Sequence, residues 1–172
     1  MKTTILCVAF LGVGIWTTTP CLADDGYKQF FHSVANTLAQ QDQQTIYSAL
    51  ELEQASKGKF TVSNSCEVAG KNFKIQLHDI NGDGIAEVFV MGGNTCTSGV
   101  TGSSLWLFVK SKQQGYHMNL GFPSADYKLL PTKHMGFPDI QIGAAGICEA
   151  VWRWNGQVYD HYKDVPVAAG GC

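Results

Sequence analysis

The chain has 172 residues, of which 45% are hydrophobic and 15% charged, and its formal net charge is −2. This length is enough for one domain with its own core and short for two. The near-neutral charge excludes a strongly basic, polyanion-binding protein, so we expect no nucleic-acid partner.

The N-terminus has the pattern of a secretory signal. A basic residue at the start is followed by an apolar run over residues 5–15, and Ala23 provides a small residue for cleavage. Residues 17–20 end the apolar run before it reaches the length of about 20 residues that a membrane span needs. We therefore expect residues 1–23 to be removed on export to a periplasmic or secreted location. Residues 24–172 should then form a single domain without a membrane span.

Residues 24–58 are predicted to be helical. Apolar residues recur there at the spacing of one helix face, namely Tyr27, Phe30, Phe31, Val34 and Leu38. A second stripe runs to Leu50, with Asp42 placed to cap its start and Gly58 to end it. We expect these helices to cover one end of a β core.

Residues 59–172 change to short runs of aromatic and branched residues, broken by glycine, serine and asparagine. The candidate strands are residues 72–78, 85–91, 104–110, 115–120, 127–130, 139–142, 149–154 and 157–162. The predicted fold class is mainly β with N-terminal helices, in a small antiparallel sheet domain.

An internal repeat relates two parts of this β region. Residues 84–90 and 136–142 share one order: glycine, an apolar residue, a small residue or proline, an acid, then alternating apolar residues. After each come a cysteine, a tryptophan-bearing strand, a glycine turn and an aromatic strand. The repeat predicts two propeller-blade-like units.

A loop rich in oxygen donors separates the first two of these strands. Asp79, Asn81, Asp83 and Glu87 alternate there with glycines, a pattern that can wrap a hard cation such as calcium. An EF-hand would need a glutamate where Val90 stands. The alternative is an ordinary Asn-Gly and Asp-Gly turn whose acids face solvent.

The loop resembles the Asp-x-Asn-Gly-Asp-Gly-x-x-Asp turn of FG-GAP or VCBS repeats, in which two strands flank a calcium ion. The resemblance covers residues 73–92 and, in a degenerate copy, residues 136–143. It implies side-chain ligands at the four loop positions just named and a backbone-carbonyl ligand at Ile85. Glu87 stands where the family usually has aspartate. We expect calcium to be structural and to hold the base of the loop that follows the next strand.

Four cysteines remain once the signal is removed. Cys66 and Cys96 lie about equally far on either side of the turn at residues 80–84, which favours a disulfide between them and a second between Cys148 and Cys172. A zinc site is the alternative, but no Cys-x-x-Cys spacing supports it.

The motifs of the common enzyme classes are absent from the sequence. It contains no Gly-x-Ser-x-Gly elbow and no His-Glu-x-x-His pair, and the even number of cysteines argues against a free nucleophilic thiol. We expect a protein without catalytic residues. A secreted hydrolase with scattered catalytic residues is the alternative.

A stretch of small and hydroxyl-bearing residues follows Cys96. We expect it to enter the cleft of a protein partner, because disulfide-held loops are rigid and often functional. The candidate contact residues are Thr97, Ser98, Val100, Thr101, Ser103 and Ser104, with Ser124 from a shorter loop. The alternative is a plain solvated connection.

Export, a calcium turn, paired cysteines and missing catalytic motifs are together similar to bacterial periplasmic immunity proteins, which protect cells from type VI secretion effectors. This resemblance implies an inhibitor that occludes the active site of a peptidoglycan amidase or muramidase. A calcium-dependent module for envelope glycan binding or adhesion, the common role of FG-GAP and VCBS repeats, is the alternative.

Overall fold

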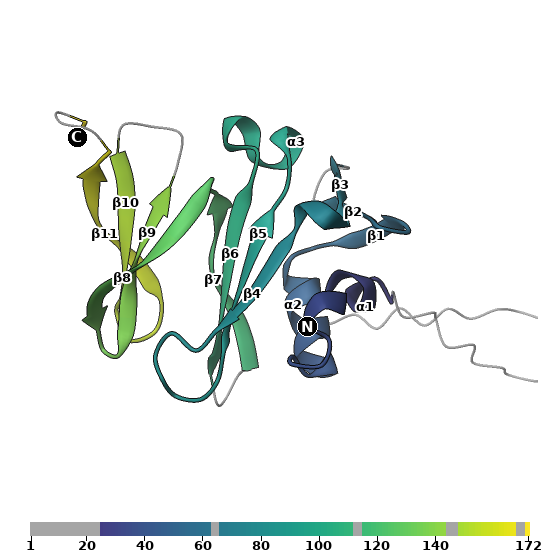
Figure 1. Ribbon diagram of the computed structural model, residues 1–172, viewed down its shortest axis with the longest axis horizontal. Coiled ribbons are helices and arrows are strands. Elements are labelled where there is room, and N and C mark those ends of the chain that lie inside the picture. The colour runs from purple at the N-terminus through teal and green to yellow at the C-terminus, as the bar shows by residue number, and fades with distance from the viewer. Residues whose placement is uncertain (1–24, 63–65, 112–114, 144–147, 168–170) are drawn as a thin grey trace, which may run out of the picture.

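The computed structural model describes residues 25–62, 66–111, 115–143, 148–167 and 171–172. The expected signal over residues 1–23 lies outside these ranges. The described residues form short N-terminal helices and three small antiparallel sheets, arranged as successive layers (Figure 1). The predicted fold class, mainly β with N-terminal helices, is confirmed.

The helical part consists of α1 (Gly26–Phe30), a 3-10 turn (His32–Val34) and α2 (Gln40–Ala49). The predicted apolar stripe faces the core, although the chain breaks it into two short helical pieces. The prediction that Asp42 caps α2 was wrong. Ala39 occupies the N-cap position, and the Asp42 carboxylate instead pairs with Lys110 at 2.8 Å.

The first sheet contains β1 (Glu53–Ser56), β2 (Lys59–Val62) and β3 (Cys66–Ala69), paired in that order. The prediction that the helical segment continues to Gly58 was therefore wrong. Every residue of β1 is exposed, so this strand has no apolar alternation, and pairing with β2 holds it in place. Gly58 forms the turn between them with a φ of 78°, a conformation that favours glycine.

The middle sheet contains β4 (Lys74–His78), β5 (Glu87–Gly92), β6 (Ser104–Ser111) and β7 (Gly115–Pro123). Its strands pair in chain order, and both of its faces are buried. Side chains alternate between the faces along each strand. The β5 valines therefore pack towards the helices and the first sheet, and Phe89 packs towards the third sheet.

The third sheet contains β8 (Asp126–His134), β9 (Phe137–Gly143), β10 (Cys148–Trp154) and β11 (Tyr159–Pro166), again paired in chain order. Its apolar face shares a core with the middle sheet. The rings of Phe89 and Tyr127 stack across this core with centroids 4.6 Å apart.

The two four-stranded sheets are the blade-like units that the repeat predicts. The last strand of each unit has a tyrosine near its start that makes the same kind of contact. The Tyr116 hydroxyl donates to the carbonyl of Ala86 at 2.6 Å, and the Tyr159 hydroxyl donates to that of Pro138 at 2.9 Å. Ala86 and Pro138 occupy equivalent positions of the repeat, one residue before its acid. The strands predicted from residue 72 onward are all present, with shifted ends.

Candidate functional site

Asp79 organises the loop of residues 79–86, which joins β4 to β5 at one end of the middle sheet (Figure 1). Its carboxylate accepts the N–H groups of Gly84 at 2.9 Å, Gly82 at 2.7 Å and Asp83 at 3.1 Å. These bonds, that of Gly84 above all, hold the pKa of Asp79 below its ordinary value.

Asn81 and Asp83 close the same loop from inside. Asn81 accepts the N–H of Asp83 at 2.9 Å, and Asp83 accepts that of Ile85 at 2.8 Å. The Asn81 amide also donates to the other Asp83 oxygen at 3.1 Å. These side chains satisfy the backbone of the loop, as in ordinary Asx turns.

Glu87 is the buried acid of the loop, with only 1% of its surface exposed. Its carboxylate accepts the N–H of Ile80 at 3.1 Å. Burial raises the pKa of Glu87 to about 7, and the negative charges of Asp83 and Asp79 act in the same direction. In the part of the chain that the structure describes, no cationic side chain pairs with Glu87.

In the second unit the acid at the equivalent position, Asp139, is paired with an arginine. Asp139 is 2% exposed, and Arg153 donates to both of its oxygens, from Nε at 2.9 Å and from Nη2 at 2.7 Å. Thr132 adds a hydroxyl donor at 2.7 Å. The hydrogen bonds from Arg153, above all, and that from Thr132 hold the pKa of Asp139 below its ordinary value although burial acts in the opposite direction. In the first unit the pairing of Val88 with Phe108 places Val109 beside Glu87, where the second unit has Arg153 beside Asp139. The charge of Glu87 therefore has no guanidinium at the equivalent position to balance it.

This ion pair gives a pH prediction. Because the pKa of Asp139 is lower in the folded chain than the value of about 3.9 expected after unfolding, the carboxylate stabilises the fold above that pH. Asp139→Asn should therefore melt below the wild type at neutral pH, and the gap should close as pH falls through the folded pKa. Thermal melts across this range check it; a gap that is independent of pH would contradict it.

The side chains of residues 79–87 carry oxygens of the kinds that bind calcium, but the structure does not direct these oxygens at one common point. Asp79, Asn81 and Asp83 direct oxygens at N–H groups of the loop, and Ile85, expected to lend its carbonyl, donates its own N–H to Asp83. Within the described ranges no three His, Cys, Asp or Glu side chains are gathered so that they could hold a metal ion. A cation would therefore have to turn the aspartates towards Glu87.

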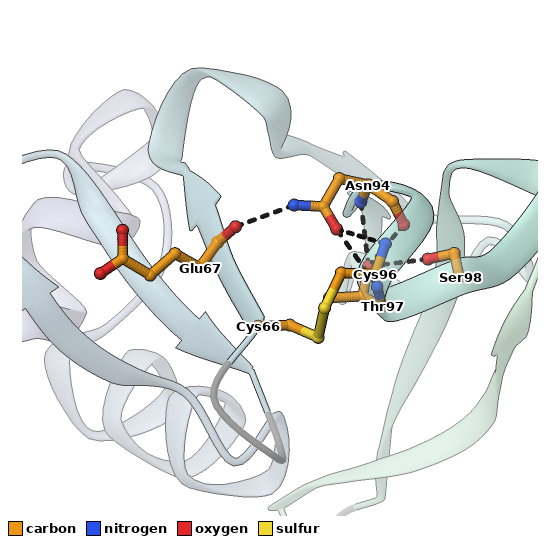
Figure 2. Close-up of a disulfide and its surroundings, with 6 residues drawn as sticks. All are labelled: Cys66, Glu67, Asn94, Cys96, Thr97 and Ser98. Atoms are coloured by element: carbon orange, nitrogen blue, oxygen red, sulfur yellow. Dashed lines mark hydrogen bonds between the residues drawn. A yellow bond between two sulfur atoms is a disulfide. The ribbon is translucent and has the colours of Figure 1, made fainter.

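Disulfides join Cys66 to Cys96 and Cys148 to Cys172, as predicted. The first connects β3 to α3 (Thr95–Ser98), which follows β5 (Figure 2). Such bonds persist in oxidising compartments, which indicates an extracytoplasmic location. None of the helices among the described residues is long and apolar enough to span a membrane.

Asn94 fixes the start of α3 and ties it to the first sheet. Its side-chain oxygen accepts the N–H of Cys96 at 2.9 Å and of Thr97 at 3.2 Å, while the Thr97 hydroxyl accepts the N–H of Asn94 at 2.9 Å. The Asn94 amide donates to the carbonyl of Glu67 at 2.8 Å, beside the disulfide (Figure 2). We call residues 93–104 the anchored loop.

Three of the predicted contact residues are buried, so the prediction that they meet a partner was wrong. Ser98 and Ser104 share a hydroxyl hydrogen bond of 2.8 Å below the loop. Ser124 donates to the carbonyls of Asp126 at 2.8 Å and Gly143 at 2.9 Å. Their hydroxyls satisfy buried polar groups of the fold and are not offered outward.

Val100 is the exposed large hydrophobic side chain of the anchored loop. It lies in the 3-10 turn Gly99–Thr101 and is 92% exposed. Thr97, Thr101 and Ser103 are partly buried. The loop thus presents an apolar side chain on a hydrogen-bonded base.

The loop of residues 79–86 and the anchored loop lie at opposite ends of β5 (Figure 1). A strand of 6 residues spans about 20 Å at about 3.3 Å per residue. The expectation that calcium holds the base of the anchored loop was therefore wrong; the Cys66–Cys96 disulfide does so.

Two positions of these sites were missed from the sequence alone. The spacing of Asn94 and Thr97 is a helix-capping signal in the sequence. Arg153 is the cation of the β-strand that pairs with the strand of Asp139. Comparison of the chain with protein-family models, curated proteins and solved structures finds no match.

Proposed function

We propose that this chain is an exported, non-catalytic binding protein that occludes the active site of a protein partner with its anchored loop. The observation that carries the proposal is Val100, almost fully exposed on a turn fixed by the Cys66–Cys96 disulfide and the Asn94 cap. A loop ordered before binding loses little conformational entropy on binding, so more of the contact energy appears as affinity.

The partner we propose is a peptidoglycan amidase or muramidase in the periplasm. The disulfides support an extracytoplasmic setting, where such enzymes act. The similarity to immunity proteins against type VI secretion effectors supports a hydrolase delivered by another cell. Occlusion needs no catalytic group on this chain, only a narrow and rigid projection.

A pull-down from periplasmic extract tests this function. Tagged wild-type chain should capture a wall hydrolase identified by mass spectrometry, and the captured enzyme should lose its activity in the complex. The Cys66→Ser, Cys96→Ser double variant is the matched control and should capture much less. Recovery of glycan alone, or turnover of wall fragments by the chain itself, would contradict the proposal and favour the glycan-binding or hydrolase alternatives.

We also propose that the loop of residues 79–87 binds calcium with a structural role. The buried Glu87 supports this, because its repeat counterpart Asp139 has a guanidinium partner and Glu87 has none among the described residues. The resemblance to FG-GAP and VCBS turns also implies that Glu87 is one of the calcium ligands, together with Asp79, Asn81 and Asp83. A bound cation would relieve repulsion between three carboxylates on one turn.

Calcium should raise the melting temperature of the wild type, and Asp83→Ala should remove that rise. The reason is that Asp83 supplies an oxygen to the cation that alanine lacks. Glu53→Ala is the control, since Glu53 is an exposed acid of β1 outside the loop. Melts with calcium and with a chelator check this; equal melting of wild type under both conditions would contradict calcium binding.

A further inference from the structure

Four hydroxyl groups of the anchored loop, those of Thr97, Ser98, Thr101 and Ser104, are hydrogen-bonded within the loop, whereas Thr95 is exposed. Thr97 caps α3, and Ser98 bonds to both Thr97 at 2.9 Å and Ser104 at 2.8 Å. Thr101 donates to the carbonyls of Ser98 at 2.5 Å and Ser103 at 3.1 Å. A partner therefore does not meet a polar surface built from these hydroxyls.

Two glycines direct the chain around Val100 so that its side chain points outward. Gly99 and Gly102 have φ values of 57° and 66°, the left-handed conformation that glycine adopts without strain. The N–H of Gly102 donates to the carbonyl of Gly99 at 3.1 Å and closes the turn. Val100 is the most exposed of the large hydrophobic side chains in the described ranges.

The anchored loop contains no charged side chain. No charged residue or histidine occurs between Glu87 and Lys110. Glu67, which the anchored loop contacts through a backbone carbonyl, turns its carboxylate away from the loop (Figure 2), and Lys59 pairs with that carboxylate at 3.1 Å. The loop thus offers shape and apolar surface without an ionic contact of its own.

We propose that the partner's cleft is uncharged and contains an apolar pocket that takes the Val100 side chain. The inference rests on the proposed function and specifies the kind of cleft involved. An acidic or basic cleft would lose the hydration of its charges to a loop that cannot replace it. Val100 is then the central anchor of the interface, surrounded by glycine and inward-facing polar residues that exclude water.

Substitutions at Val100 test this with the protein captured by wild-type chain as the probe. Val100→Ala should weaken binding about tenfold, because it removes about two buried methyl groups. Val100→Asp should weaken it about a hundredfold or more, because it buries a charge in an apolar pocket. Met135→Asp is the control: Met135 is also exposed and lies on the β8–β9 turn, at the end of the third sheet opposite Ser124 and Gly143, and binding should be unchanged. All three variants should melt like the wild type.

Salt provides the second readout. Raising NaCl from about 0.05 to about 0.5 M should change the wild-type affinity by less than about threefold, because no ion pair forms at the loop. Full binding by Val100→Asp in a complex with a wall hydrolase would overturn this inference and leave the proposed function standing. A Val100-dependent complex with another kind of protein would support the inference and overturn the proposed partner. No captured protein at all would overturn both.

Discussion

Replacing Phe89 with alanine should lower the free energy of unfolding by about 3–5 kcal/mol. Phe89 is fully buried between the middle and third sheets and stacks on Tyr127. Removing its ring leaves a cavity in a core to which both sheets contribute, and the neighbouring strands are paired on both sides of β5 and cannot readily fill it.

Chemical denaturation measures this loss. Met118→Ala is the surface control, since Met118 is partly exposed on β7, and it should change the free energy by about 0.5 kcal/mol or less. A loss for Phe89→Ala of less than about 1 kcal/mol would show that the two blade-like units do not depend on a shared core.

Removing the first disulfide with Cys66→Ser and Cys96→Ser should cost about 2–4 kcal/mol of stability and most of the partner binding. The stability loss follows from the freedom that the unfolded chain regains when residues 30 positions apart are no longer linked. The binding loss has another cause: α3 is a helix of 4 residues, too short to persist without its anchor.

The second disulfide is the matched control. Cys148 and Cys172 are 24 positions apart, so their removal should cost nearly the same stability in the chain-entropy account. It does not touch the anchored loop, and binding should persist. Equal loss of binding in both double variants, measured at a temperature where both are folded, would contradict a specific role for Cys66–Cys96.

The sheets could be predicted where burial alternates along the chain. On β5 and β6 successive residues face the two cores in turn, and the alternating aromatic and branched residues are visible in the sequence. The repeat also predicted that two units of strands follow one another along the chain, because residues 84–90 and 136–142 lead into equivalent strands. The first sheet could not be predicted in the same way, since β1 buries no side chain and its position depends on pairing with β2.

The candidate sites were only partly predictable. Cysteine spacing was sufficient for both disulfides, because the hairpin between Cys66 and Cys96 brings its ends together. Residue type could not show which hydroxyls are consumed by the fold, so Ser98 and Ser124 were assigned to the surface although they satisfy buried backbone and side-chain groups. The exposure of Val100 likewise depends on the turn made by the glycines around it.

The central claim is that the anchored loop blocks a partner's active site. Titrating the chain into the captured wall hydrolase, with a small soluble peptidoglycan fragment as substrate, tests it most directly. The account predicts that one equivalent of wild-type chain abolishes cleavage of the fragment, whereas Val100→Asp does not at the same concentration. A complex that forms while the fragment is still cleaved at the rate of the free enzyme would contradict the account.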